Sequence, residues 1–215
     1  MRYDLAIFDM DGTILNTIED LADSLNVSLK HFGCPERSLA EVKAFVGNGI
    51  RLLIERGVPA GMDEKRIDEV HCYFMEHYKK HCMDKTRPYE GIPDLLCRLR
   101  REGCRTAVVS NKADSAVKIL ADKYFNGLFD IAVGERPGIL KKPSPDSVND
   151  ILNQLGIERH RSVYIGDSEV DIATARNACM DGIIVEWGFR EAEFLREQGA
   201  SVLVRTPEQL LRLIL

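Results

Sequence analysis

The stretch Leu5-Ala6-Ile7-Phe8-Asp9-Met10-Asp11-Gly12-Thr13 joins four consecutive apolar residues to two aspartates that stand one residue apart. The apolar run is continuous rather than alternating, which is typical of a strand covered on both faces. The two aspartates would then lie at the carboxyl end of a buried strand, where open parallel sheets bind their ligands. This stretch therefore predicts an α/β fold with a polar site at one edge of the sheet.

Further strand-like and helix-like runs alternate along the rest of the chain. We expect strands at 106–109, 131–133, 162–165 and 183–185, and helices at 113–124 and 170–178. Strand and helix in alternation predict a doubly wound parallel sheet, a Rossmann-like core whose crossovers are right-handed.

The character of the chain changes between Thr17 and about Arg87, where strand-like runs vanish and helical spacing dominates. We expect an all-helical cap subdomain at 17–87, inserted into an α/β catalytic core formed by 1–16 and 88–215. Residues near Asn16 and Arg87 would be its hinges.

The predicted insert begins and ends at recognisable signals. Thr17 followed by Asp20 resembles a capping box that would begin the first helix. The sequence Arg87-Pro88-Tyr89-Glu90-Gly91 is rich in helix-breaking residues and would return the chain to the core.

Composition excludes several classes of partner. The formal net charge of -5 leaves no basic excess for binding nucleic acid. No run approaches membrane-spanning length, and the first apolar stretch is too short and too acidic for a signal peptide. The six cysteines show no Cys-x-x-Cys spacing, which favours a reducing cytoplasm. We expect a cytoplasmic monomer or homodimer that contacts neither nucleic acid nor membrane.

Polar residues follow the other two strong strand-like runs as well. Ser110-Asn111-Lys112 comes after the second run, and Gly166-Asp167-Ser168-Glu169-Val170-Asp171 comes after the third. Between them, the prolines of Lys141-Lys142-Pro143-Ser144-Pro145-Asp146 would stiffen the start of a helix and hold a lysine at fixed reach. Because parallel strands end at one edge, these residues should gather near Asp9 and Asp11. Two carboxylates so close repel each other and favour a hard cation such as Mg²⁺.

The ordered set of motifs resembles the haloacid dehalogenase superfamily, in its branch of phosphatases with a helical cap inserted after the first motif. The corresponding motifs are Asp9–Thr13, Ser110, Lys142-Pro143 and Gly166–Asp171. Each motif alone would be weak, but four in the family's order span nearly the whole chain.

The resemblance implies a phosphatase that acts through an aspartyl-phosphate. Asp9 would attack phosphorus, and Asp11 would protonate the leaving alkoxide and then activate the hydrolytic water. Ser110, the backbone of Asn111 and the Lys142 ammonium group would hold the transferring phosphoryl group.

The resemblance also implies a Mg²⁺ site. The cation would be held by Asp9, by the backbone carbonyl of Asp11 and by Asp167. Asp171 would lie just outside these ligands and orient water or Lys142.

A loop in the insert, Val46-Gly47-Asn48-Gly49-Ile50-Arg51, resembles the substrate-selecting cap loop of phosphoglycolate phosphatases. So does the segment Trp187-Gly188-Phe189. We expect Arg51, or backbone amides beside Gly47 and Gly49, to meet the leaving group of a small phosphorylated metabolite, phosphoglycolate being the best guess. The alternative is an ordinary glycine turn with Arg51 facing water.

Other activities of the family stay open. They include a pyrophosphatase, a nucleotide or sugar-phosphate phosphatase, and a β-phosphoglucomutase-like phosphotransferase. Leu21 disfavours the mutase, which carries a histidine early in its first cap helix. Asp11 and Asp167 argue against a dehalogenase, and Asp11 also argues against a phosphonatase. A phosphate-ester binding or regulatory module is the non-enzymatic alternative.

His77 and His81 stand at helical spacing that could suit a zinc ion. Because further ligands and a Cys-x-x-Cys partner are missing, we favour an amphipathic helix with exposed histidines.

Overall fold

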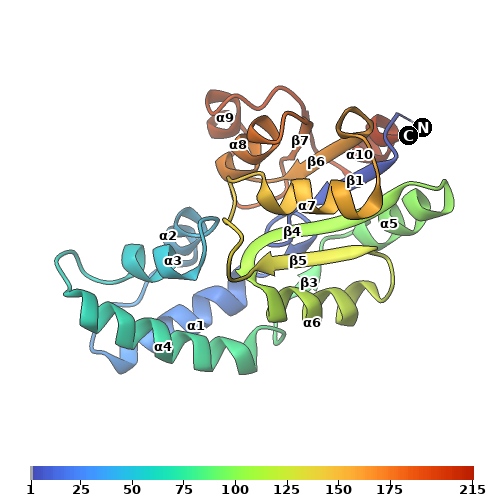
Figure 1. The fold of residues 1–215 in the computed structure, drawn as a ribbon. Coiled ribbons are helices and arrows are strands. Elements are labelled where there is room, and N and C mark those ends of the chain that lie inside the picture. Colours follow the sequence, from blue (N-terminus) through green and yellow to red (C-terminus); the bar gives the residue numbers. More distant parts are fainter. Residues whose placement is uncertain (1) are drawn as a thin grey trace. The chain divides into compact units, whose positions relative to one another are not determined.

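The computed structural model describes residues 2–215 (Figure 1). Contacts between Cα atoms divide the chain into two compact units. One unit comprises the chain up to Leu15 together with Pro88–Leu215, and the other comprises Asn16–Arg87. No helix within residues 2–215 is both long enough and apolar enough to cross a lipid bilayer.

Within residues 2–215, six parallel strands form the main sheet in the order β5-β4-β1-β6-β7-β8. They are β1 (Leu5–Phe8), β4 (Arg105–Ala113), β5 (Ile131–Glu135), β6 (Ser162–Gly166), β7 (Asp181–Val185) and β8 (Leu203–Val204). The predicted doubly wound α/β core is confirmed. Of these strands, only β8 was not predicted, because two residues carry too little pattern to be recognised.

Helices cover both faces of this sheet. They are α5 (Ile92–Arg101), α6 (Asp114–Phe125), α7 (Asp146–Leu155), α8 (Glu169–Asn177), α9 (Ala192–Glu197) and α10 (Pro207–Ile214), with a short 3₁₀ helix at Arg159–Arg161. Figure 1 shows α6 and α7 on opposite sides of β5.

Strand β1 is fully buried because its side chains pack alternately into the two layers. Leu5 and Ile7 belong to a core cluster with Val148 of α7 and Ala175 of α8. On the other face, the ring of Phe8 contacts Phe129 edge-on, with centroids 6.3 Å apart. An uninterrupted apolar run is what a strand covered on both sides requires.

Strand β4 contains an irregularity directly before its end. Val109 aligns with Val133 and Ala113 with Glu135, so β4 uses four steps where β5 uses two. The extra residues form a bulge, which changes the directions of the side chains that follow Val109. Gly134 lies against this bulge, and a Cβ there would come within 2.3 Å of the Lys112 carbonyl oxygen.

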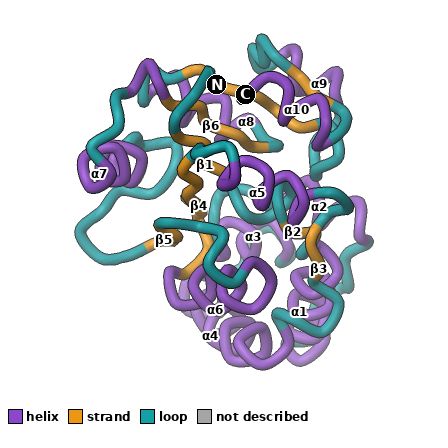
Figure 2. Tube along the Cα trace, turned by 90° about the vertical axis from the view of Figure 1, so that its right-hand side faces the viewer, coloured by secondary structure: helices purple, strands orange, loops and turns teal. Residues whose placement is uncertain are grey.

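The second unit is helical. Its helices are α1 (Ile18–His31), α2 (Leu39–Phe45), α3 (Ile50–Gly57) and α4 (Glu64–His81). Helices α1 and α4 pack along each other, as both views show (Figures 1 and 2). Two short strands, β2 (Leu15–Asn16) and β3 (Arg87–Pro88), pair where the chain passes between the units.

The predicted capping box at the start of α1 is wrong. Thr17 makes no capping hydrogen bond with its side chain, and its buried hydroxyl has no hydrogen-bond partner within residues 2–215. The Asp20 carboxylate instead accepts hydrogen bonds from the backbone N–H of Lys85, at 2.9 Å and 3.2 Å, and of Thr86, at 2.8 Å. These donors belong to the chain that leaves α4, and spacing along α1 cannot reveal them.

We expect Asp20→Ala to lower the free energy of unfolding by about 1–3 kcal/mol, because it leaves two backbone N–H groups without their acceptor. Asp23→Ala is the matched control. It removes a half-exposed ion pair with the Lys85 ammonium group and should cost about 0–1 kcal/mol. Urea unfolding followed by circular dichroism measures both, and equal losses would contradict the role given to Asp20.

Candidate active site

Three neighbouring strands reach the carboxyl edge of the sheet, where β1 and β6 end and β4 continues through its bulge to Ala113. Phe8 of β1 aligns with Val108 of β4 and with Ile165 of β6, so the residues that follow them emerge side by side. Figure 2 shows β6, β1, β4 and β5 succeeding one another across the sheet. The site residues predicted in the first unit lie at this edge or form hydrogen bonds or ion pairs with residues that do. They are Asp9, Asp11, Ser110, Asn111, Lys142, Asp167 and Asp171.

The ammonium group of Lys142 lies at the centre of the site. Its Nζ is 2.8 Å from Asp9 Oδ1 and 2.8 Å from Asp171 Oδ1, and its side chain is 3% exposed. The Asn111 amide fixes the backbone of the lysine. Asn111 Nδ2 donates to the Lys142 carbonyl at 3.0 Å, and Lys142 N–H donates to Asn111 Oδ1 at 2.8 Å. The last part of β4 and the loop after β5 are therefore tied together.

Asp171 holds Lys142 from the first turn of α8. Its Oδ2 accepts hydrogen bonds from the backbone N–H groups of Asp167 and Ser168 and from the Ser168 hydroxyl at 2.6 Å. The hydroxyl of Tyr164 lies 3.2 Å from its Oδ1. Charged hydrogen bonds of this kind hold a carboxylate in one position.

Asp167 is enclosed by two loops that approach it closely. Its oxygens accept hydrogen bonds from the Thr13 hydroxyl at 3.2 Å and from the Phe189 backbone N–H at 2.8 Å. A Cβ at Gly12 or at Gly188 would come within 2.3 Å of an Asp167 atom, so only glycine fits at either position. Gly12 also has a φ of +87°, which favours glycine.

Like charges crowd the site. Oxygens of Asp9, Asp167 and Asp171 all lie within 4.8 Å of one another. Burial raises the pKa of the Asp9 carboxyl well above its usual range, and Lys142 opposes this rise without cancelling it. Burial and the neighbouring Asp171 raise the pKa of Asp167 to about 7. Three clustered carboxyl groups with one ammonium group beside two of them carry more acidic than basic groups, and a hard divalent cation fits this set of donors.

Lys142 stays charged in this surrounding. Burial by itself would lower the pKa of its ammonium group, but the carboxylates of Asp171 and Asp9 outweigh burial and raise that pKa well above its usual range. A permanent positive charge beside Asp9 can attract a phosphoryl group.

A second lysine–aspartate pair lies at the same edge. Lys112 Nζ is 2.8 Å from Asp11 Oδ1 and 3.0 Å from Asp11 Oδ2. Lys112 emerges from the β4 bulge, as does Ser110, whose hydroxyl accepts a hydrogen bond from the Lys112 backbone N–H at 3.2 Å. We did not predict this pair, because a side chain on a bulge does not follow the alternation of a strand.

Thr13 and Tyr164 were also not assigned a role from the sequence. Thr13 lies inside the first motif, where a threonine is expected in a turn. Tyr164 lies inside an apolar run, where a tyrosine is expected in the core. No signal in the sequence marks their contacts with Asp167 and Asp171.

The candidate residues of the insert belong to the second unit. Gly47 and Gly49 have φ values of +119° and +91° in the connection between α2 and α3. The Arg51 guanidinium contacts the carboxylates of Glu55, Glu64 and Asp68, all in the same unit. Its charge is already balanced there, and a role at the leaving group stays a prediction.

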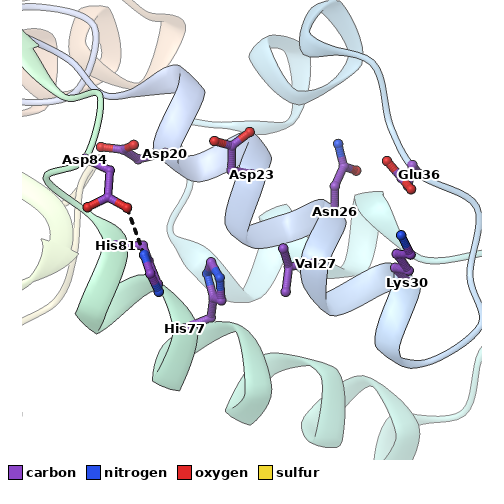
Figure 3. A pocket seen from close by; sticks show the side chains of 9 residues that line it. All are labelled: Asp20, Asp23, Asn26, Val27, Lys30, Glu36, His77, His81 and Asp84. Atoms are coloured by element: carbon purple, nitrogen blue, oxygen red, sulfur yellow. Dashed lines mark hydrogen bonds and ion pairs between the residues drawn. The ribbon is translucent and has the colours of Figure 1, made fainter.

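His77 is half-buried, so the expectation of an exposed histidine was wrong there, whereas the His81 side chain is 46% exposed. Their rings stack with centroids 4.3 Å apart, and His77 Nδ1 lies 3.0 Å from the Ser24 hydroxyl of α1. Both line a pocket of about 430 Å³ between α1 and α4 (Figure 3). Within residues 2–215, neither joins a group of three metal-ligating atoms as compact as the aspartate cluster.

Comparison with known proteins gives a consistent result. The family of haloacid dehalogenase-like hydrolases matches residues 6–185. A phosphoglycolate phosphatase of Aquifex aeolicus is 32% identical over 97% of this chain and 95% of its own length. An N-acetylmuramic acid 6-phosphate phosphatase of Pseudomonas aeruginosa is 28% identical over 98% of this chain and 94% of its own length.

A solved structure is closely similar as well. A protein of Lactobacillus delbrueckii subsp. bulgaricus, provisionally assigned as a phosphoglycolate phosphatase, superimposes with a TM-score of 0.96 at 40% identity. The superposition covers 100% of this chain and 99% of the other.

We expect Asp171→Asn to destabilise the protein by about 3–5 kcal/mol, because it breaks a buried pair and places an amide N–H₂ among hydrogen-bond donors. Asp150→Asn is the matched control, since it alters a partly exposed pair with Arg136 and should cost about 0–1 kcal/mol. Thermal unfolding compares the two. A midpoint for Asp171→Asn as high as that of the control would refute the buried pairing.

Proposed function

The chain belongs to the haloacid dehalogenase-like hydrolases and is a phosphatase, and from this premise we propose that it hydrolyses a small phosphomonoester through an aspartyl-phosphate on Asp9. The observation that carries the proposal is the position of Lys142 Nζ, 2.8 Å from Asp9 Oδ1 at the carboxyl edge of the sheet. A nucleophile needs such a cation beside it when it approaches a dianionic phosphate.

The first half of the reaction would transfer the phosphoryl group to the enzyme. A carboxylate oxygen of Asp9 attacks phosphorus, and the bond between phosphorus and the ester oxygen breaks. Asp11 gives its proton to that oxygen, which leaves as an alcohol. Lys142 and the Ser110 hydroxyl stabilise the charge on the phosphoryl oxygens.

The second half would release phosphate. Asp11, now a carboxylate, takes a proton from water, and the resulting hydroxide attacks phosphorus of the aspartyl-phosphate. The bond between phosphorus and the Asp9 oxygen breaks, so phosphate leaves and both aspartates return to their initial states. Asp9 thus acts first as nucleophile and then as leaving group, and Asp11 acts first as acid and then as base.

Members of this family generally use a divalent metal, and we propose Mg²⁺ here. Asp9, Asp167 and the Asp11 backbone carbonyl would hold it, while Asp171, bound to Lys142, orients that lysine. When bound, Mg²⁺ supplies positive charge that offsets the crowded carboxylates and the substrate phosphate.

The best candidate for the substrate is phosphoglycolate, because the relative from Aquifex aeolicus is named a phosphoglycolate phosphatase. The relative from Pseudomonas aeruginosa favours a second candidate, a sugar-acid phosphate. Both are phosphate esters of an alcohol that also bears a carboxylate. The six cysteines, all within residues 2–215, are free thiols, which suits the cytoplasm we propose as the compartment.

We expect Asp9→Asn to lower kcat for phosphoglycolate by more than about 10³-fold, because an amide cannot form the covalent intermediate. Acid quenching of the wild-type enzyme during turnover should trap a phosphorylated protein, and mass spectrometry should find the phosphoryl group on Asp9. Asp122→Asn, which changes an exposed aspartate on α6, should retain full activity. Unchanged turnover in Asp9→Asn would exclude this mechanism, and binding of phosphate esters without any turnover would indicate a binding module.

Chelation should abolish hydrolysis, and added Mg²⁺ should restore it. We expect Asp167→Asn to raise the half-saturating Mg²⁺ concentration by about 10- to 100-fold, because it removes a charged ligand. Steady-state assays over a Mg²⁺ series measure this shift. An identical Mg²⁺ dependence in Asp167→Asn and wild type would place the cation elsewhere.

A further inference from the structure

Lys112 is a buried cation with an unusual partner. Its side chain is 2% exposed, and its Nζ contacts both oxygens of Asp11, the residue that would exchange protons with the leaving group. Among residues 2–215, Lys112 and Lys142 are the two buried lysines. Burying an ammonium group is costly unless an anion stays beside it.

While Asp11 contacts Lys112 in this way, it cannot donate a proton to the ester oxygen of the substrate. Both carboxylate oxygens are engaged with one ammonium group. To reach the ester oxygen, Asp11 must turn at least one of these oxygens away from Lys112. The lysine is buried in the β4 bulge and keeps its position, so another anion can occupy the place beside it that this oxygen leaves.

We propose that Lys112 is the subsite for a carboxylate on the leaving group, so that the substrate's own anion takes the place of Asp11 beside this lysine. The inference rests on the proposed function and names its substrate class, a phosphate ester of a hydroxy acid. When the substrate binds, its carboxylate replaces Asp11 beside Lys112. The same step frees Asp11 to act as the acid.

The chemistry of such a substrate fits the distances in the site. In the ester of an α-hydroxy acid, one carbon separates the ester oxygen from the carboxylate. The group that protonates this oxygen and the group that binds the carboxylate must therefore be close neighbours. Asp11 and Lys112 meet this condition, with oxygen–nitrogen distances of 2.8 Å and 3.0 Å.

Lys142 is less suited to this role. It is held between Asp9 and Asp171, and the Asp171 side chain is 0% exposed and bound by four donors besides Lys142. Asp11, in contrast, has a side chain that is 15% exposed, so another anion can approach the position it occupies. Lys142 therefore binds the phosphoryl group, and Lys112 binds the leaving group.

The test compares phosphoglycolate with its neutral amide, phosphoglycolamide, in wild type and Lys112→Met. We expect the ratio of kcat/KM values, acid over amide, to fall by about 10- to 100-fold in Lys112→Met. Any general damage to Asp11 lowers both rates and leaves the ratio unchanged. Lys118→Met removes an exposed lysine of α6 and should preserve the wild-type ratio.

A second comparison protects the test against a folding defect, because joint removal of both partners leaves no buried charge unpaired. Calorimetry should show that Asp11→Asn still binds phosphoglycolate more tightly than the amide, and that Asp11→Asn/Lys112→Met does not. An unchanged preference without Lys112, or a wild type that hydrolyses both esters equally well, would overturn the inference and leave the phosphatase proposal standing. A wild type that hydrolyses neither ester nor a generic aryl phosphate would overturn both.

Discussion

Negative charge in excess, buried at the carboxyl edge of the sheet, is the constraint around which the site is organised. Asp9 and Asp171 flank the ammonium group of Lys142, and an oxygen of Asp167 lies within 4.8 Å of oxygens of both. Such crowding in a low-dielectric space is tolerable only when hydrogen-bond donors and further positive charge compensate it. The backbone N–H groups near α8 provide part of this compensation, and the divalent metal that members of this family generally use would supply further positive charge.

Close approach of the backbone makes this crowding possible. Gly12 and Gly188 let two loops contact Asp167, and a Cβ at Gly166 would come within 2.2 Å of Asp171. On the other side of β1, Gly134 makes room for the bulge in β4 that carries Ser110 and Lys112. Glycines at these positions are therefore part of the site, although none of them offers a side chain to the chemistry.

The two buried lysines separate the reaction type from the choice of substrate. Lys142 is tied to Asp171 by a contact between fully buried groups, so its place beside Asp9 is fixed. Lys112 is paired with Asp11 at the rim, where a substrate anion can exchange with that aspartate. A family that keeps the first pair can retain phosphoryl transfer while the surroundings of the second change with the leaving group. Arg51, already bound by three carboxylates of its own unit, is a less available cation for the same purpose.

The sequence by itself determined the parallel α/β core and the family, because continuous apolar runs such as Leu5–Phe8 and polar residues directly after them depend only on local pattern and order. It also indicated that Asp9 and Asp167 directly follow strands, whereas Ser110, expected after a strand, lies inside β4. Only the tertiary structure decided that Lys112 meets Asp11, that Asp20 binds the backbone at Lys85 and Thr86, and that Tyr164 reaches Asp171. Such pairings depend on the bulge, on the close glycine contacts and on segments distant in the chain, and residue spacing carries no information about them.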